Sequence, residues 1–177
     1  AGTIREAGER LQSISEKARD FARIAEREPT SAETDLRSLA AEVLADVRED
    51  HPTAALTLDV DVASAEVRTD PDLLSMALSN LVDNAVVHAP ADPSATVRIR
   101  DGAAPGAVRL RVDDGNPEIQ SAELAPIRSG DETDLQHGSG IGLWIVNWCV
   151  TALNGELTFE YDDGNVVAIE LPPDSGG

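Results

Sequence analysis

Apolar residues recur in the first part of the chain at alternating steps of four and three residues. Between residues 4 and 28 they are Ile4, Ala7, Leu11, Ile14, Ala18, Phe21 and Ala25. This spacing aligns them along one side of a helix, as in a coiled coil, and Pro29 ends the helical pattern. The segment contains no second helix for this side to pack on. We therefore expect residues 4–28 to form an arm that joins two copies of the chain; the alternative is a helix that folds back on the following domain.

The rest of the chain alternates between helical and strand periods. A polar connector is expected at 29–35 and an irregular polar segment at 120–136. The pattern predicts helices beginning at Leu36, at Asp70-Pro71 and after Gly142, and strands at 55–62, 95–101, 107–113, 156–161 and 165–171. This order predicts an α/β (α+β) two-layer sandwich, in which helices cover one face of a mixed β-sheet, preceded by a long N-terminal helix. We divide the chain into residues 1–30 and 31–177.

The charge of the chain narrows the range of partners. Its 33 acidic and 14 basic residues give a formal net charge of −19, and Lys17 is the only lysine. A nucleic acid or an anionic membrane needs a basic face, so we expect neither as a partner. Such a composition is typical of salt-loving microbes, because molar salt shortens the Debye length to about 3 Å and screens the repulsion. The alternative is an acidic protein adapted to ordinary salt.

A single cysteine, Cys149, lies within an apolar segment and permits no disulfide within the chain. We expect it to be a small buried side chain, as suits a reducing compartment. No run of residues is apolar over the length needed to span a membrane. The predicted location is therefore the cytoplasm, including the cytoplasmic part of a membrane-associated sensor.

A glycine-rich loop provides the first candidate chemistry. Glycines alternate with other residues in Gly138-Ser139-Gly140-Ile141-Gly142, and an apolar segment with helical spacing follows. A glycine loop that opens a helix directs free N–H groups and the positive end of the helix dipole toward a ligand, which suits phosphate. The alternative is a turn whose glycines only allow close packing.

Three polar residues recur every four positions on the helix that begins at Asp70. They are Asn80, Asn84 and His88, and the first two lie among apolar positions. A buried amide is unfavourable unless it is hydrogen-bonded. The asparagines therefore form either a polar network within the core or ligands at a site.

Three segments together resemble a known family. Asn80 with Asn84, the run Asp114-Gly115-Asn116-Pro117-Glu118-Ile119, and the run Gly138 to Leu143 resemble the N box and the first and second glycine boxes of the GHKL ATPase superfamily. The similarity covers roughly residues 33–172 and is greatest to the catalytic domains of sensor histidine kinases. It implies a Bergerat-type ATP-binding fold. The helix at 4–28 is similar to the second helix of the dimerisation and histidine-phosphotransfer hairpin.

The resemblance implies a role for each matched residue. Asn84 corresponds to the asparagine that binds Mg²⁺, and an amide oxygen is a suitable hard ligand. Asn80 stands where hydrolytic relatives carry a glutamate that activates water, and an amide cannot act as that base. His88 corresponds to a residue near adenine and ribose. Asp114 corresponds to the acceptor of the adenine amino group, with Asp113 as the alternative if the loop is shifted.

The two glycine boxes complete the expected cofactor site. In the first, which extends to Ile119, Asn116 and Glu118 replace family glycines. In the second, the phosphate-binding residues are His137, Gly138, Ser139, Gly140, Ile141, Gly142 and Leu143. Val87 stands where the family usually has a lysine or arginine.

The implied function is the ATP-binding catalytic core of a two-component sensor histidine kinase. It would transfer the γ-phosphate of ATP, with Mg²⁺, to a histidine on an upstream helix that this chain does not contain. The further partners implied are the receiver domain of a response regulator and a second copy of the chain. The alternative is a nucleotide-binding or dimerisation module with weak or no kinase activity. A dinucleotide-binding or Walker loop is excluded, because the glycine spacing differs and no lysine follows the glycines.

Overall fold

The computed structural model describes residues 2–129 and 140–173. The helices are α1 (Gly2–Ala25), α2 (Leu36–Asp50), α3 (Pro71–Val87), α4 (Ser121–Ser129) and α5 (Ile141–Ala152). The strands are β1 (Ala32–Asp35), β2 (Ala55–Asp61), β3 (Glu66–Thr69), β4 (Ser94–Asp101), β5 (Val108–Asp114), β6 (Glu156–Tyr161) and β7 (Asn165–Leu171).

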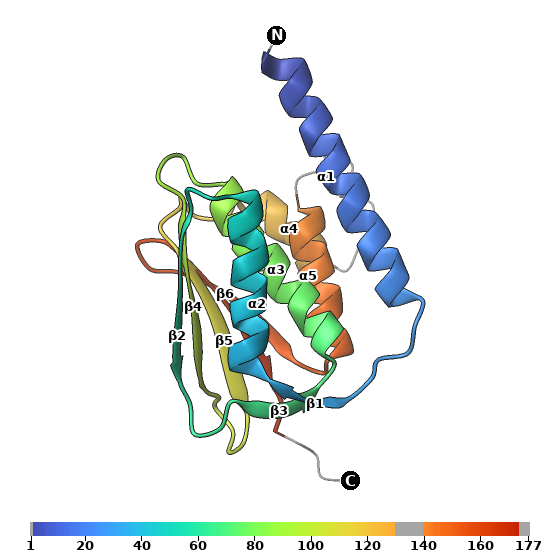
Figure 1. The fold of residues 1–177 in the computed structure, drawn as a ribbon, viewed down its shortest axis with the longest axis vertical. Helices are drawn as coiled ribbons and strands as arrows, with labels where there is room; N and C mark the ends of the chain where they lie inside the picture. Colours follow the sequence, from blue (N-terminus) through green and yellow to red (C-terminus); the bar gives the residue numbers. More distant parts are fainter. Residues whose placement is uncertain (1, 130–139, 174–177) are drawn as a thin grey trace.

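Five strands form one mixed sheet in the order β2-β4-β5-β7-β6. The β2–β4 pair is parallel and the other pairs are antiparallel. Helices α2, α3 and α5 lie over one face of this sheet, and α1 extends past them (Figure 1). The predicted α/β two-layer fold with helices on one face of a mixed sheet is confirmed.

Alternation along β4 and β5 separates the two faces of the sheet. Val97 pairs with Val112, and Ile99 pairs with Leu110; all four side chains are buried in the core. The residues between them point to the opposite face, because successive side chains in a strand alternate. On that outer face the arginines of the two strands form ion pairs with carboxylates.

Two predictions of irregular structure were wrong. Residues 32–35, expected as part of a connector, form β1, which pairs with β3 in a small second sheet from Ala32↔Thr69 to Asp35↔Glu66. Residues 121–129, expected as irregular, form α4. A four-residue strand is too short to show a period, and α4 buries little besides Leu124.

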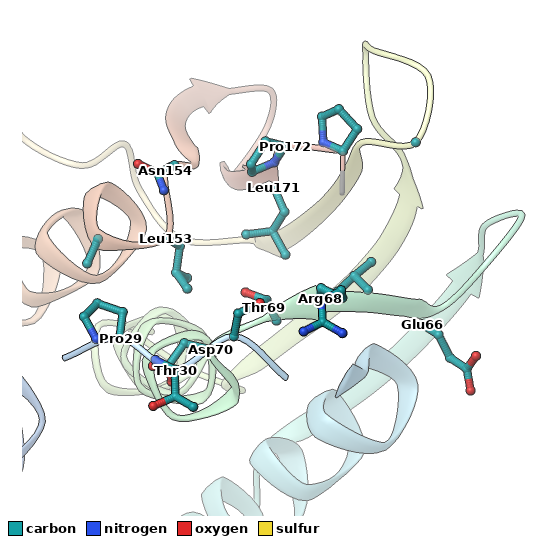
Figure 2. Close-up of a pocket in the computed structure, with 15 residues that line it drawn as sticks. Pro29, Thr30, Glu66, Arg68, Thr69, Asp70, Leu153, Asn154, Leu171 and Pro172 are labelled. Carbon is teal, nitrogen blue, oxygen red and sulfur yellow. The ribbon is translucent and has the colours of Figure 1, made fainter. Parts of the chain in front are cut away.

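The small sheet faces the end of β7 across a cleft of about 330 Å³ (Figure 2). The linker between α1 and β1 and the end of α5 complete its walls. None of the residues for which the sequence predicts a catalytic or cofactor-binding role lines this cleft.

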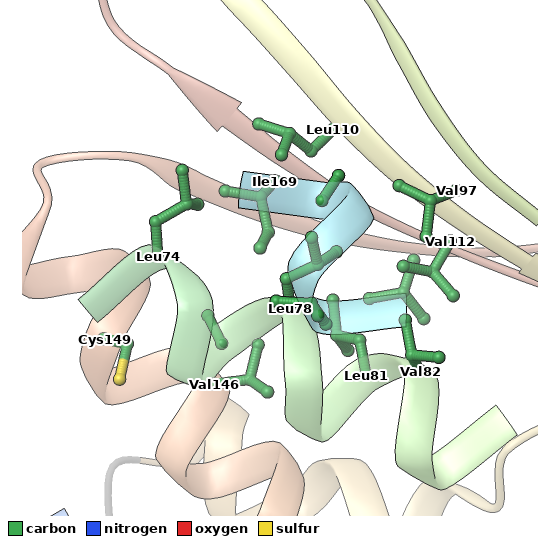
Figure 3. Close-up of a cluster of buried hydrophobic side chains, with 14 of the residues drawn as sticks. Leu74, Leu78, Leu81, Val82, Val97, Leu110, Val112, Val146, Cys149 and Ile169 are labelled. Atoms are coloured by element: carbon green, nitrogen blue, oxygen red, sulfur yellow. The ribbon is translucent and has the colours of Figure 1, made fainter. Parts of the chain in front are cut away.

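The core lies between the helices and the sheet. Figure 3 shows Leu78 and Val82 of α3 and Val146 of α5 facing Leu110 and other strand residues. Cys149 is fully buried, as predicted, and burial raises the pKa of its thiol to about 12. In residues 2–129 and 140–173, none of the helices combines the length and apolar character needed to cross a membrane.

The two halves of α1 have different surroundings. Ile4 is 83% exposed and Leu11 is 66% exposed. Phe21 instead makes edge-to-face contacts with Trp144 and Trp148 of α5, at ring-centroid distances of 5.2 and 4.9 Å. The C-terminal half of the expected arm therefore folds back on the domain, whereas the apolar residues of the N-terminal half lie open to solvent.

Candidate nucleotide-binding site

A cavity of about 240 Å³ lies between α3, α4, the first turn of α5 and the ends of β5 and β7. The candidate residues that line it are Asn84, His88, Asp114, Asn116, Glu118, Ile119, Gly140, Gly142 and Leu143. Leu81, Val112 and Val167 add apolar walls. The structure thus brings together parts of three segments that lie far apart in the sequence. His137, Gly138 and Ser139 fall outside the described residues.

Helix α3 carries the two asparagines to the start of α5. Asn84 lines the cavity, and Asn80 lies one turn earlier with its side chain 7% exposed. A Cβ atom on Gly142 would lie 3.2 Å from Oδ1 of Asn84 and 3.4 Å from Oδ1 of Asn80. Gly142 therefore allows the two helices to approach closely at this point.

The two ends of the Asn80 amide differ in their contacts. Its Nδ2 donates a hydrogen bond to the carbonyl oxygen of Met76 at 2.9 Å. Its Oδ1 is buried and has no hydrogen-bond partner among the described residues. A buried amide oxygen without a partner is unfavourable, so the asparagines do not form a closed polar network within the core. Unlike Asn84, Asn80 does not line the cavity between α3 and α5.

Asp114 is held by an asparagine at the start of β7. Its Oδ1 accepts hydrogen bonds from the Asn116 N–H at 2.9 Å, and from the N–H and Nδ2 of Asn165 at 3.1 Å each. Its Oδ2 takes part in no hydrogen bond with a described residue. One carboxylate oxygen is thus used to fix the loop, and the other is available to a ligand at the cavity wall.

The structure directs Asp113 and Asp114 to opposite faces of β5. Asp113 forms ion pairs with Arg98 and Arg111 on the outer face of the sheet. Asp114 lines the cavity on the inner face. Of the two carboxylates that the sequence left as alternatives, Asp114 is the one that lines the cavity.

Asn116 and Glu118, the two positions where the resemblance implies glycines, differ in their surroundings. The Asn116 side chain is 7% exposed, and its Nδ2 donates to the Ala85 carbonyl oxygen at 2.8 Å, which ties the loop to α3. Glu118 is exposed at the rim. Glu123 of α4 adds a further carboxylate, and His88 is the only described lining residue that can carry a positive charge.

The first turn of α5 supplies backbone donors. Gly140 caps the helix with a φ of 100°, in the left-handed region that favours glycine. No side chain of the described residues caps this end, and the first N–H groups of a helix have no partner within the helix. These donors and the dipole favour an anionic group at this end of the cavity.

Asn165 is a residue of the cavity wall that sequence reasoning missed. It is 4% exposed and lines the cavity. Besides its bonds to Asp114, its Oδ1 accepts from the Ile119 N–H at 2.9 Å, and its Nδ2 donates to the Pro117 carbonyl oxygen at 2.9 Å. A polar residue that opens an otherwise apolar strand was the available signal. Its partners lie 46 to 51 residues away, so their identity could not be read from the sequence.

Comparisons with known proteins agree with this geometry. Residues 69–175 match the family described as histidine kinase-, DNA gyrase B-, and HSP90-like ATPases. The chain is 31% identical over 162 residues to the probable sensor histidine kinase TcrY of Mycobacterium tuberculosis, which covers 88% of the chain and 33% of that protein. The chain therefore spans about a third of the length of this relative.

Two solved structures are similar over most of the chain. The mycobacterial sensor histidine kinase MprB has a TM-score of 0.65 and 26% identity, covering 81% of this chain and 98% of that one. Full-length ShkA in complex with AMPPNP has a TM-score of 0.70 and 25% identity, covering 97% of this chain and 38% of that one. The second similarity includes the N-terminal helix as well as the sheet and its helices.

Proposed function

Because the chain belongs to the family of histidine kinase-, DNA gyrase B- and HSP90-like ATPases, as a catalytic domain homologous to those of sensor kinases, we propose that it binds ATP between α3, β5 and α5 and supports phosphate transfer to a histidine. The observation that carries this proposal is the convergence of Asn84, Asp114 and the uncapped start of α5 on one cavity. A carboxylate acceptor and a cluster of N–H donors at opposite walls suit a base and a phosphate chain, respectively.

Asp114 receives the adenine in this proposal. Because the hydrogen bonds from Asn116 and Asn165 occupy Oδ1, the carboxylate has a fixed orientation and Oδ2 remains as an acceptor. The exocyclic amino group of adenine can donate a hydrogen bond to that oxygen. Guanine carries a carbonyl group at the corresponding ring position and cannot donate from it. The site would therefore favour adenine over guanine nucleotides.

Asn84 suits a Mg²⁺ ion at the phosphate end. Its amide oxygen is a hard ligand, and its side chain lines the cavity. When bound, Mg²⁺ would neutralise charge on the phosphate oxygens. The residues of the chain orient the phosphates: the N–H groups of the α5 first turn donate to them, and Gly142 leaves room beside the asparagines. Since neither amide can take a proton from water, the site favours transfer to another nucleophile over hydrolysis.

The N-terminal half of α1 supports a proposal about assembly. Its exposed apolar residues, among them Ile4 and Leu11, have the spacing of a helix–helix seam. We infer that this half packs in a helical hairpin that contains the acceptor histidine and pairs with a second copy. A response regulator receiver domain would then take the phosphate. ATP is available inside the cell, so the proposed location is the cytoplasm.

Adaptation to high salt is a further part of this proposal. It is supported by the net charge of −19 and the single lysine. We expect the melting temperature to rise between 0.1 M and molar KCl, because screening removes repulsion among the acidic groups. A melting temperature that stays constant would contradict the adaptation without affecting the nucleotide site.

A second candidate function is a nucleotide-binding module without transfer. It is favoured by the carboxylates of Glu118 and Glu123 at the cavity, where no described lysine or arginine balances the phosphates. The two candidates differ in their response to Mg²⁺ and in whether labelled phosphate reaches an acceptor helix supplied in trans.

Calorimetry of ATP binding in molar KCl tests the proposed site. We expect micromolar binding that requires Mg²⁺ and falls at least tenfold in Asn84→Ala, because the variant lacks the amide oxygen at the metal. The matched control is Asn147→Ala, which removes an asparagine from α5 outside the cavity. Equal binding by the wild-type chain and Asn84→Ala would contradict the proposed metal ligand. Absence of binding to the folded wild-type chain would contradict the site as a whole.

A further inference from the structure

A carboxylate on α3, Asp83, is shared by two side chains that can carry a positive charge. Its Oδ2 accepts a hydrogen bond from Nζ of Lys17 at 2.7 Å, and its Oδ1 lies 3.2 Å from Nε2 of His51. Lys17 belongs to α1, and His51 caps the C-terminus of α2. Asp83 therefore joins three helices at one point, and it does not line the nucleotide cavity.

The backbone fixes His51 independently of α1. Its N–H donates to the carbonyl oxygen of Val47 at 2.8 Å, and its own carbonyl oxygen accepts from the N–H of Ala54 at 3.0 Å. The side chain is 31% exposed, so the ring exchanges protons with solvent. A histidine is the side chain that ordinarily changes its charge between about pH 5 and pH 8. A neutral ring leaves the full negative charge of Asp83 to Lys17.

Lys17 and Phe21 attach the same segment of α1 to the domain. They are four residues apart and therefore lie on one side of the helix. Phe21 contacts Trp144 and Trp148, which are the two tryptophans of the chain. The aromatic contacts carry no charge, so the ion pair of Lys17, the only lysine, is the part of this attachment that a nearby charge can change.

The hollow beside Asp83 is lined by charged groups from three helices. Its volume is about 300 Å³, and the charged residues that line it are Glu16, Lys17, Asp20, Asp46, Asp50 and Asp83. The two carboxylates of α1 already have partners: Asp20 pairs with Arg23 at 2.8 Å, and Glu16 accepts a hydrogen bond from Gln12 at 3.1 Å. Lys17 is therefore the group of α1 through which a change of charge at Asp83 acts.

The charged groups near His51 on α2 and β2 stay in place whether or not α1 is attached. Asp46 and Asp50 belong to α2, the helix that His51 caps. Arg48 of the same helix donates to the carbonyl oxygen of Leu56 at 2.7 Å. On β2, Asp59 pairs with arginines on the outer face of the sheet. None of these groups reverses the effect of a proton on His51 upon Lys17.

From this arrangement we infer that Asp83, Lys17 and His51 form a pH-sensitive attachment of α1, which weakens when His51 gains a proton. The proton places a second positive charge on the carboxylate that Lys17 uses, and the two cations repel each other across it. A fall in pH through the range in which histidine titrates therefore releases α1 from α3.

Cleavage by a lysine-specific protease tests this attachment on the intact chain without nucleotide, because the bond after Lys17 is the only one that it can cut. Lys17 must leave Asp83 to be cut, so the rate follows the fraction of chains in which α1 is released. At fixed KCl concentration, we expect the rate relative to His51→Gln to rise about threefold between pH 8 and pH 6. Glutamine cannot gain the charge, and the ratio removes the pH dependence of the protease itself.

Tryptophan emission provides a second readout. It should move to longer wavelength at pH 6, because release of α1 exposes Trp144 and Trp148 to water. In Lys17→Met, which leaves His51 in place, the emission should no longer depend on pH over this range. This variant keeps the test valid if His51→Gln destabilises α2. The matched control His88→Gln changes a histidine of the nucleotide cavity and should retain the response.

Three results would overturn the inference. A cleavage ratio that is equal at pH 8 and pH 6 would show that a proton on His51 does not affect the attachment. A lower ratio at pH 6 would show that the proton strengthens it. An emission change that persists in Lys17→Met, or that disappears in His88→Gln, would assign the response to other groups. None of these measurements uses ATP, so they are independent of the nucleotide proposal.

Discussion

The nucleotide cavity and the joint between α1 and the domain are held together by different kinds of contact. Around the cavity, a single carboxylate, Asp114, is fixed by backbone N–H groups and by the Asn165 amide. At the joint, charges are paired: Arg27 with Asp70, and Lys17 with Asp83 at 2.7 Å. The neutral donors of the cavity do not titrate, whereas each pair at the joint depends on the charge of both partners. The difference predicts that salt weakens the attachment of the arm more than it changes the geometry of the nucleotide site.

Asp70 lies at the centre of the joint. It caps α3 through the N–H groups of Asp72 and Leu73 and is 3% exposed. Its side chain also accepts from Arg27 and from Thr30, so it connects the linker, the end of the arm and the helix that carries the asparagines. The aromatic contacts of Phe21 lie next to this joint on α5 and do not depend on charge.

The largest effect is expected from Asp70→Ala. It leaves Arg27 without its buried partner and removes the α3 cap, so the free energy of unfolding should fall by about 3 kcal/mol. Urea unfolding measures this loss. The control Asp72→Ala removes a carboxylate that is 69% exposed and should lower it by less than about 0.5 kcal/mol. If the two regions are independent, ATP affinity of the folded Asp70→Ala chain stays within twofold of wild type; a larger change would contradict the comparison.

The next largest effect is expected from Asp114→Ala. Loss of the carboxylate should weaken ATP binding by about 100-fold, equivalent to about 2.8 kcal/mol, because it removes the acceptor and frees the loop. The neighbouring variant Asp113→Ala is the matched control, since its ion pairs lie on the outer face of the sheet. Calorimetry on both should show a change in Asp114→Ala alone. Comparable losses in the two variants would show that the cavity residue has been misassigned.

A smaller effect is expected from Asn165→Ala. The variant keeps Asp114 but removes the side-chain contacts to Asp114, Pro117 and Ile119. ATP affinity should fall by about tenfold, or about 1.4 kcal/mol, because Asp114 and the loop lose their fixed orientation. The Ile119 amide signal should move in the NMR spectrum. Unchanged affinity together with a moved signal would mean that the orientation of the loop does not limit binding.

The smallest expected effect is the pH dependence of stability at the joint. Burial would raise the pKa of Asp70, but hydrogen bonds from Arg27, Thr30 and Leu73 outweigh it and hold the pKa below its ordinary value. A carboxylate with a lowered pKa contributes stability above its unfolded pKa and loses it as the pH falls through the folded value. The free energy of unfolding should therefore decline below about pH 4.

Asp70→Asn separates this contribution from that of other acidic groups. Asparagine also caps helices but does not titrate, so the variant should lose less stability than the wild type over the same acidic range. Urea unfolding at several pH values measures both slopes. Identical slopes would show that Asp70 does not control the acid response of the joint.

Much of the fold could be predicted from apolar periodicity. The period identifies α2, α3, α5 and the strands of the large sheet, because those segments bury one face over two or more turns or repeats. It does not identify β1 and β3, since four-residue strands are stabilised mainly by pairing with each other. It does not identify α4 either, whose burial depends on contacts with distant segments.

Some features of the candidate site could likewise be predicted from the sequence, and others depend on the fold. The types and spacing of Asn80, Asn84 and Asp114 are visible in the sequence, and they lead to the expected family. Which of Asp113 and Asp114 lines the cavity depends on the pleat of β5. The contact of Asn165 with Asp114 depends on the pairing of β5 with β7. The cleft beside the small sheet could not be predicted, because β3, which lines it, was not predicted.

The sequence by itself determined which segments form the layers and which residues could meet a nucleotide, because period and residue type are local properties of the chain. The tertiary structure decided which half of α1 is covered, which of two adjacent carboxylates faces the cavity, and which polar groups remain without partners. Those outcomes depend on residues tens of positions apart, such as Asp114 and Asn165, whose contacts form only when the sheet assembles.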